Sequence, residues 1–244
     1  MKRFISLSKY PSSNGKYFYT NFFKLYNIEA EYVPLPATDE NFEDQIRTST
    51  DLGVSGISVS MPFKHQASCL ILDYCDFSVS NYNSCNTIVI KDKKLYGYNT
   101  DLQGVIQTST KIQSKSVAIL GDGSMANMYS KYLSNRDITI NMYSRRLQNW
   151  DDRHDNNAEV VINCTGIGTV DDESPLLSLK NKKLVIDLAI KKKELYKQCL
   201  NNDVEYISGS EFYKHQFLKQ FMLYTGVLVN ELEFDKIEAE KNDY

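Results

Sequence analysis

The chain of 244 residues has few of the residues that build metal sites or disulfide frameworks. It contains three histidines and an odd number of cysteines, five, with no C-x-x-C spacing, so we expect neither a metal site nor disulfides. No apolar run approaches the ~20 residues that cross a bilayer, and the apolar stretch at the N-terminus is too short for a signal peptide. The formal net charge of −3 offers no basic field for nucleic acid or anionic membranes. We therefore expect a cytoplasmic protein that binds neither nucleic acid nor membrane.

Short β-type runs alternate with helical stretches along the whole chain, which favours an α/β fold with mostly parallel sheets. The expected strands are residues 3–6, 30–33, 56–59, 86–91, 94–98, 116–120, 137–143, 159–163, 183–188 and 204–207. The expected helices are residues 16–26, 41–49, 124–134, 191–200 and 210–234, the last of them interrupted by Gly226. We expect the charged tail, 235–244, to be frayed.

A glycine-rich turn, Gly121-Asp-Gly123-Ser124-Met-Ala126, follows an apolar strand and precedes a helix. Gly121 permits the tight turn, Gly123 lets backbone N–H groups approach a pyrophosphate, and Ala126 allows close packing of the helix on the strand. Ser124 can cap the helix, whose N-terminus favours a phosphate. This pattern predicts a Rossmann domain that binds a dinucleotide.

The end of the following strand indicates which dinucleotide is bound. NAD enzymes usually carry Asp or Glu there, about 20 residues beyond the glycines, to bind the ribose hydroxyls. This chain has Ser144-Arg145-Arg146 instead, and a guanidinium can bind a 2′-phosphate bidentately. We therefore predict NADP as the cofactor; a solvated basic turn is the alternative.

Lys64 and Asp101 stand in two further distinctive segments, Gly56-Ile-Ser-Val-Ser60-Met-Pro-Phe-Lys64 and Tyr98-Asn-Thr-Asp101. Reduction of a carbonyl with NAD(P)H requires from the protein a proton, a charge that polarises the carbonyl and a substrate cradle. A lysine and an aspartate at strand ends could supply these. A surface lysine and a helix-capping aspartate are the alternatives.

Together these segments resemble the shikimate dehydrogenase family. The first is similar to the family's GxNVTxPFK element, Asn86-Thr-Ile to its AVNTI element, and Gly97-Tyr-Asn-Thr-Asp101 to its GxNTD element. The elements that follow in family order are Gly121–Ala126, Ser144-Arg145, Asn163-Cys-Thr165-Gly-Ile-Gly168, and Gly209 with Gln216 and Thr225-Gly226. The resemblance covers almost the whole chain.

The resemblance implies NADPH-dependent reduction of 3-dehydroshikimate to shikimate, on the route to chorismate and the aromatic amino acids. It implies that Lys64 and Asp101 are the catalytic pair. The substrate-binding residues that it implies are Ser12, Asn14, Ser60, Asn86 and Gln216. The cofactor-binding residues would be Gly121, Gly123, Ser124, Ala126, Ser144, Arg145, Arg146, Thr165 and Gly209.

The chain departs from the family at several positions around the ligand. The SxSP element, which holds the substrate carboxylate, aligns with Ser12-Ser-Asn14-Gly15, so an asparagine replaces its second serine. The Asn and Thr of NVT are Ser58 and Ser60. Ile190-Lys-Lys replaces a Tyr-x-Pro, and Phe212-Tyr213 replaces a Met-Leu pair. The departures leave quinate or another cyclic hydroxy acid open as the substrate, and a non-catalytic NADP-binding module is the alternative from another class.

We expect two domains. An N-terminal α/β substrate domain would comprise residues 1–101, completed by a C-terminal helix from 213–244. The Rossmann NADP-binding domain, with a parallel sheet, would span 102–212. We expect a monomer or a homodimer that binds a small-molecule substrate.

Overall fold

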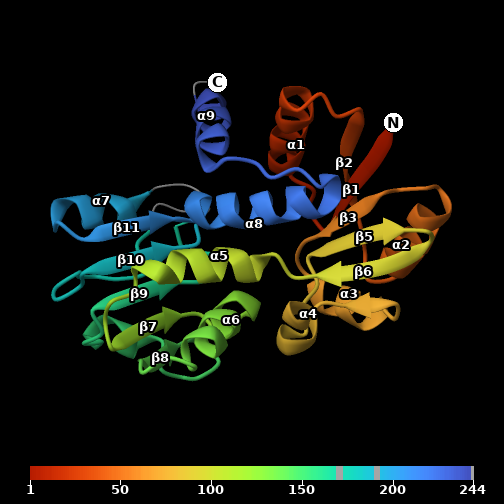
Figure 1. Cartoon of the computed structure of the whole chain (residues 1–244). Coiled ribbons are helices and arrows are strands. Elements are labelled where there is room, and N and C mark those ends of the chain that lie inside the picture. The colour runs from red at the N-terminus through yellow and green to blue at the C-terminus, as the bar shows by residue number, and fades with distance from the viewer. Residues whose placement is uncertain (169–172, 190–192, 243–244) are drawn as a thin grey trace. The chain divides into compact units, whose positions relative to one another are not determined.

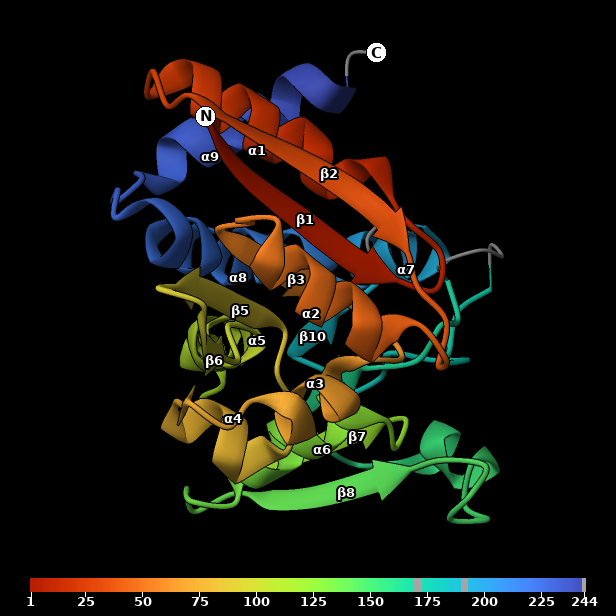
Figure 2. The ribbon, with the colours of Figure 1, turned by 90° about the vertical axis from the view of Figure 1, so that its right-hand side faces the viewer.

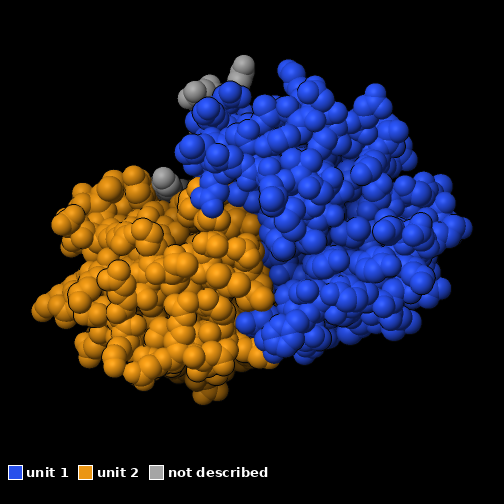
Figure 3. Space-filling view, in the orientation of Figure 1, with its two compact units in different colours: residues 1–101, 217–244 blue, residues 102–216 orange. Residues whose placement is uncertain are grey.

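The structure, a computed structural model, describes residues 1–168, 173–189 and 193–242 (Figure 1). The chain divides into two compact units, residues 1–101 with 217–244 and residues 102–216 (Figure 3). Each unit has a sheet with helices packed on it, which confirms the expected α/β class. The segment Ile190-Lys-Lys, one of the departures from the family, lies outside the described residues.

Unit 1 is built on a six-stranded mixed sheet with the order β2-β1-β3-β5-β6-β4. The strands are β1 (Lys2–Ser8), β2 (Ala30–Pro36), β3 (Gly56–Val59), β4 (Tyr74–Cys75), β5 (Thr87–Lys91) and β6 (Lys94–Tyr98). Strands β1, β2 and β3 are parallel, and β5 and β6 form a hairpin, with β5 antiparallel to β3. The carboxyl ends of β1, β3 and β6 and the start of β5 therefore lie at one edge of the sheet.

Aromatic side chains form much of the core on one face of this sheet. The helices of unit 1 are α1 (Ser13–Leu25), α2 (Phe42–Asp51), α3 (Lys64–Leu70), α4 (Phe77–Tyr82), the C-terminal part of α8 (Gly209–Thr225) and α9 (Glu231–Asn242). Phe18 of α1 stacks on Phe234 of α9 with ring centroids 4.5 Å apart, and Phe217 of α8 packs against both rings. Figure 2 shows α1 and α9 side by side.

The expectation of a frayed tail is wrong. As expected, Gly226, at φ +79°, interrupts the helical stretch and separates α8 from α9, but α9 continues to Asn242. Phe234 and Ile237 of α9 are buried, and the Tyr17 hydroxyl of α1 donates to the backbone carbonyl of Ile237. Burial of these apolar side chains against α1 stabilises a helix whose charged sequence gave little sign of it.

Unit 2 contains a five-stranded, wholly parallel sheet with the order β11-β10-β9-β7-β8. The strands are β7 (Ser116–Leu120), β8 (Thr139–Tyr143), β9 (Val160–Asn163), β10 (Leu184–Asp187) and β11 (Glu205–Ser208). The helices include α5 (Asp101–Thr108), α6 (Ser124–Leu133) and α7 (Glu194–Asn201), with short 3-10 turns at Ser109–Lys111 and Asp151–Asp155. The strand order reverses between β7 and β9, and open α/β sheets bind ligands at the carboxyl ends of the strands flanking such a point.

None of the described helices is long and apolar enough to cross a bilayer.

Candidate functional site

Lys64 and Asp101 form an ion pair at the carboxyl edge of the sheet of unit 1. Lys64 Nζ lies 2.5 Å from Asp101 Oδ2. Lys64 begins α3, shortly after β3, and Asp101 begins α5, shortly after β6. The Asp101 side chain is 6% exposed and that of Lys64 18% exposed. The carboxylate is thus buried, while the ammonium retains access to solvent and has two further N–H bonds to donate.

The backbone that carries Lys64 is fixed on both sides. Phe63 is buried and stacks on Phe42 of α2, with ring centroids 4.7 Å apart. The carbonyl of Lys64 accepts a hydrogen bond of 2.8 Å from the N–H of Cys85, just before β5. The start of α3 therefore contacts α2 on one side and the segment before β5 on the other. These contacts limit the positions that the ammonium can take.

Asn86 holds the second oxygen of Asp101. Its Nδ2 donates to Asp101 Oδ1 over 2.9 Å, and its Oδ1 accepts from the backbone N–H of Thr100 over 2.8 Å. Because a backbone N–H can only donate, this contact sets the orientation of the Asn86 amide. Both carboxylate oxygens of Asp101 therefore have defined partners, Asn86 on one side and Lys64 on the other.

Gln220 of α8 extends this network. Its Nε2 donates to Thr87 Oγ1 over 2.6 Å and to the Asn86 carbonyl over 3.3 Å, and its Oε1 accepts from the Tyr19 hydroxyl over 2.9 Å. Thr87 Oγ1 in turn donates to Asn86 Oδ1 over 2.8 Å. A continuous chain of hydrogen bonds therefore links Tyr19 of α1, through Gln220, Thr87 and Asn86, to the Lys64 ion pair.

The SxSP-like segment lies at the N-terminus of α1. Ser12 is the N-cap residue, and its Oγ accepts from the backbone N–H of Asn14 over 3.1 Å. The Oδ1 of Asn14 accepts a hydrogen bond from Lys241 Nζ. Each side chain still has hydrogens to donate: the Ser12 hydroxyl and the Asn14 amide nitrogen.

Ser58, Ser60 and Gln216 differ in their surroundings. Ser58 points into the interior, where its hydroxyl contacts Gln220 Oε1 at 3.2 Å and the Tyr224 hydroxyl at 3.0 Å. Ser60, just after β3, is exposed, and its hydroxyl has no hydrogen-bond partner among the described residues. Gln216 is half-buried on α8, one turn before Gln220, and falls within unit 2.

In unit 2 the glycine turn has the geometry of a phosphate-binding loop. Gly121 adopts φ +106°, and a Cβ there would lie 3.3 Å from the carbonyl oxygen of Cys164 after β9. Gly123 is the N-cap residue of α6 and has no side chain to cap the helix. No atom lies within 4 Å of the position that a Cβ would take there. The open space above the helix N-terminus suits a pyrophosphate, so these residues fit a dinucleotide. Ala126 is fully buried under the turn.

The expectation that Ser124 caps α6 is wrong, because Gly123 is the N-cap residue. Ser124 is instead the first helical residue and is exposed. With no side-chain acceptor at the cap, backbone N–H groups of the first turn are left for a ligand.

The two arginines after β8 have different partners. Arg146 Nε lies 2.7 Å from Asp122 Oδ2, which also accepts from the buried Ser144 hydroxyl over 3.0 Å. These contacts offset the charge of a carboxylate in the glycine turn. Arg145 is exposed, and its guanidinium makes no ion pair within the part of the chain that the structure describes.

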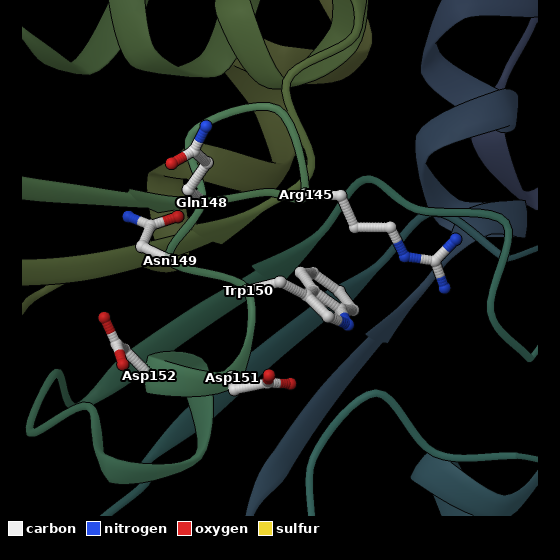
Figure 4. Close-up of a pocket in the computed structure, with 6 residues that line it drawn as sticks. All are labelled: Arg145, Gln148, Asn149, Trp150, Asp151 and Asp152. Atoms are coloured by element: carbon white, nitrogen blue, oxygen red, sulfur yellow. The ribbon is translucent and has the colours of Figure 1, made fainter.

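Arg145 lines a pocket of about 460 Å³ (Figure 4). The other lining residues are Gln148, Asn149, Trp150, Asp151 and Asp152. The guanidinium of Arg153 lies over the Trp150 ring, 3.9 Å from its centroid, and thereby fixes the indole. The pocket follows β8, where the sequence predicted recognition of the adenosine end of the cofactor.

Thr165 and Gly209 lie near the carboxyl ends of β9 and β11. The N–H and hydroxyl of Thr165 both donate to Asn163 Oδ1, over 3.1 and 2.6 Å, and Asn163 Nδ2 donates to Asp187 Oδ1 over 2.9 Å. Burial raises the pKa of the Asp187 carboxyl. A Cβ on Gly209 would lie 2.6 Å from the Leu188 carbonyl oxygen, so close packing on the loop after β10 requires a glycine there.

Among the described residues, no group of three or more His, Cys, Asp or Glu side chains is arranged to hold a metal ion.

Comparisons with known proteins point to one family. A family model described as the shikimate dehydrogenase substrate binding domain matches residues 11–88. The chain is 26% identical over 253 residues to a shikimate dehydrogenase (NADP(+)) of Methanosphaera stadtmanae, covering 89% of each chain. It is 28% identical over 226 residues to one of Pyrococcus abyssi, covering 84% of each.

The fold is likewise that of solved shikimate dehydrogenases. The structure of a shikimate 5-dehydrogenase of Thermus thermophilus in complex with NADP(H) and shikimate is similar with a TM-score of 0.84. The match covers 98% of this chain and 99% of that one, at 16% identity. The chain belongs to the shikimate dehydrogenase family.

Within this family member, sequence reasoning missed Gln220 and Tyr19. Gln220 is 4% exposed and lies four residues after Gln216, so the two share one face of α8. That spacing was the only signal in the sequence. The partners of Gln220 are 133 and 201 positions away, at Thr87 and Tyr19, and no local pattern reports such contacts.

We expect Gln220→Leu to lower the free energy of unfolding by about 2 kcal/mol, because the buried hydroxyls of Thr87 and Tyr19 each lose one hydrogen-bond partner. Urea unfolding measures this. Lys219→Leu, at the exposed neighbouring position, is the matched control and should change stability by less than about 0.5 kcal/mol. Equal stability of the two variants would contradict the role given to the Gln220 amide.

Proposed function

We propose that this protein is a shikimate dehydrogenase that catalyses the reversible, NADPH-dependent reduction of 3-dehydroshikimate to shikimate, a step toward chorismate and the aromatic amino acids. The observation that carries the proposal is the Lys64–Asp101 ion pair, held by Asn86. These three residues come from the elements through which the sequence resembles the family. Relatives that match most of the chain are named shikimate dehydrogenase (NADP(+)).

The ion pair suits the protonation that such a reduction requires. NADPH, when bound, supplies the hydride that reduces the carbonyl carbon. The carbonyl oxygen gains negative charge, and the Lys64 ammonium can stabilise that charge and donate a proton to it. The resulting amine regains its proton from water, since the Lys64 side chain is not fully buried. Asp101 keeps the Lys64 ammonium oriented.

The substrate residues that we propose have complementary hydrogen-bonding groups. Ser60 and Gln216 offer hydroxyl and amide groups that can both donate and accept, as the hydroxyls of a ring acid require. Asn86 and Asp101, which lie beside Lys64, would contribute further polar groups to the substrate site. Ser12 and Asn14 would bind the carboxylate.

For the cofactor, we propose that Gly121, Gly123, Ser124 and Ala126 form the pyrophosphate site at the N-terminus of α6. The strand order reverses beside this turn, between β7 and β9. Thr165, after β9, and Gly209, after β11, would complete this surface.

At the adenosine end, we propose that Arg145 binds the 2′-phosphate beside the pocket that follows β8. Ser144 and Arg146 would hold the turn that carries it, through their contacts with Asp122. An exposed guanidinium without an ion-pair partner in the described chain is available to an anionic ligand.

Lys64→Met should lower kcat for shikimate oxidation by about 10²- to 10⁴-fold, because the proton donor is lost, and should leave NADP⁺ affinity unchanged. NADPH absorbance follows the rate with shikimate, quinate or neither. Lys94→Met, at an exposed position in the β5–β6 hairpin, is the control. Near-normal turnover of Lys64→Met would refute the proposed role of Lys64. A preference of the wild type for quinate would identify quinate, rather than shikimate, as the substrate.

Trp150 is the only tryptophan of the chain, so its fluorescence reports on the pocket beside Arg145. We expect NADP⁺ and adenosine 2′,5′-bisphosphate to change its emission, and nicotinamide mononucleotide to leave it unchanged. Arg145→Ala should weaken NADP⁺ binding by roughly 10- to 100-fold, the range of a charge-assisted hydrogen bond, and should affect NAD⁺ far less. Lys180→Ala, an exposed cation of unit 2, is the control. Equal losses for NADP⁺ and NAD⁺ would contradict recognition of the 2′-phosphate.

A further inference from the structure

We propose that Lys241, near the end of α9, supplies the positive charge that binds the carboxylate of the substrate, together with Ser12 and Asn14. The inference rests on the proposed function and adds to it a residue that determines specificity for an acid. It concerns the segment in which the chain departs from the family, where Asn14 stands in place of a serine.

Contacts along α1 and α9 bring Lys241 to this segment. Tyr26, near the end of α1, bonds to Glu233 in the first turn of α9, and Tyr17 donates to the carbonyl of Ile237 further along α9. The two helices therefore run antiparallel, side by side (Figure 2). The C-terminal end of α9 consequently lies at the N-terminal end of α1.

The stacked core between these helices fixes that arrangement. Phe234 of α9 is fully buried and nearly parallel to Phe18, with an angle of 4° between the rings. Lys241 is thus held by a packed helix rather than by a loose tail.

Among the described residues, the ammonium of Lys241 contacts neutral groups. It donates to Asn14 Oδ1 and lies 5.8 Å from the centroid of the Tyr17 ring and 5.6 Å from that of Phe18. Throughout the described part of the chain, no carboxylate lies within ion-pair distance of it. A half-buried cation held by two rings and one amide has N–H bonds left for an anion.

The other polar groups at this helix end also present donors. Because Asn14 Oδ1 accepts from Lys241, the Nδ2 group of Asn14 is the end that can donate to a ligand. Ser12 Oγ accepts the Asn14 N–H, which leaves the hydroxyl hydrogen to donate. The first turn of α1 contains no acidic residue, and its dipole favours an anion. One ammonium, one amide and one hydroxyl together match a carboxylate.

Lys241 has a competing structural explanation. A lysine in the last turn of a helix interacts favourably with the helix dipole, and the contact with Asn14 could simply join α9 to α1. On that explanation, loss of the charge would lower stability but would not distinguish an acid from its ester. A comparison of the acid with its ester therefore distinguishes a role in carboxylate binding from a purely structural role.

The test compares shikimate with methyl shikimate, which has the same ring and no charge. Lys241→Met should raise the KM or the dissociation constant for shikimate by roughly 10- to 100-fold, with kcat changed far less, and should leave the constants for methyl shikimate unchanged. Lys241→Arg should restore most of the affinity for shikimate. Lys236→Met, at an exposed position of the same helix, should alter neither ligand.

Two outcomes would overturn the inference. One is an unchanged affinity of Lys241→Met for shikimate; the other is an equal loss of affinity for shikimate and for its ester. Thermal unfolding of each variant shows whether the substitution has caused a general loss of structure. If Lys241→Met has lost its structure, the affinity of Lys241→Arg for the two ligands tests the inference instead. Wild-type protein that neither binds nor oxidises shikimate would refute the proposed function and this inference together, whereas an active wild type with an unaltered Lys241→Met would refute the inference alone.

Discussion

The pairing of Lys64 with Asp101 is the interaction on which the account of this site depends. A buried carboxylate loses the hydration that stabilises its charge, so its ionised form requires a cation and hydrogen-bond donors nearby. Asp101 obtains both, from the Lys64 ammonium and the Asn86 amide. Buried ion pairs are weak sources of stability. This pair is therefore better explained by what it does for the lysine, whose ammonium it holds in one orientation at a partly open surface.

The sheet of unit 1 explains why residues far apart in the sequence meet there. Strands β1, β3 and β6 end at one edge, and β5 starts at the same edge because it is antiparallel to β3. Asn86 and Asp101 flank the two strands of one hairpin, and α3 brings in Lys64. The site is thus a consequence of topology, and the Gln220 network anchors it to α1 and α8.

The sequence was sufficient for the features that depend on local pattern. Gly121 is needed by the backbone of one turn, and apolar runs predicted every strand except the two-residue β4. The order of the tail from residue 235 was not predicted, because the stability of α9 comes from Phe234 and Ile237 packing on α1 rather than from its own charged sequence. The position of Lys241 beside Asn14 depends on that same packing, so it too became visible only in the structure.

A double-mutant cycle on the ion pair tests the central claim most directly. Lys64→Met, Asp101→Asn and the double variant would be compared by kcat/KM for shikimate oxidation at one pH. If Asp101 acts by holding the Lys64 ammonium, the double variant should be about as slow as Lys64→Met alone, because the two residues function as a unit. If the two losses instead multiply, each residue acts independently, and the account of a carboxylate that serves the lysine is contradicted.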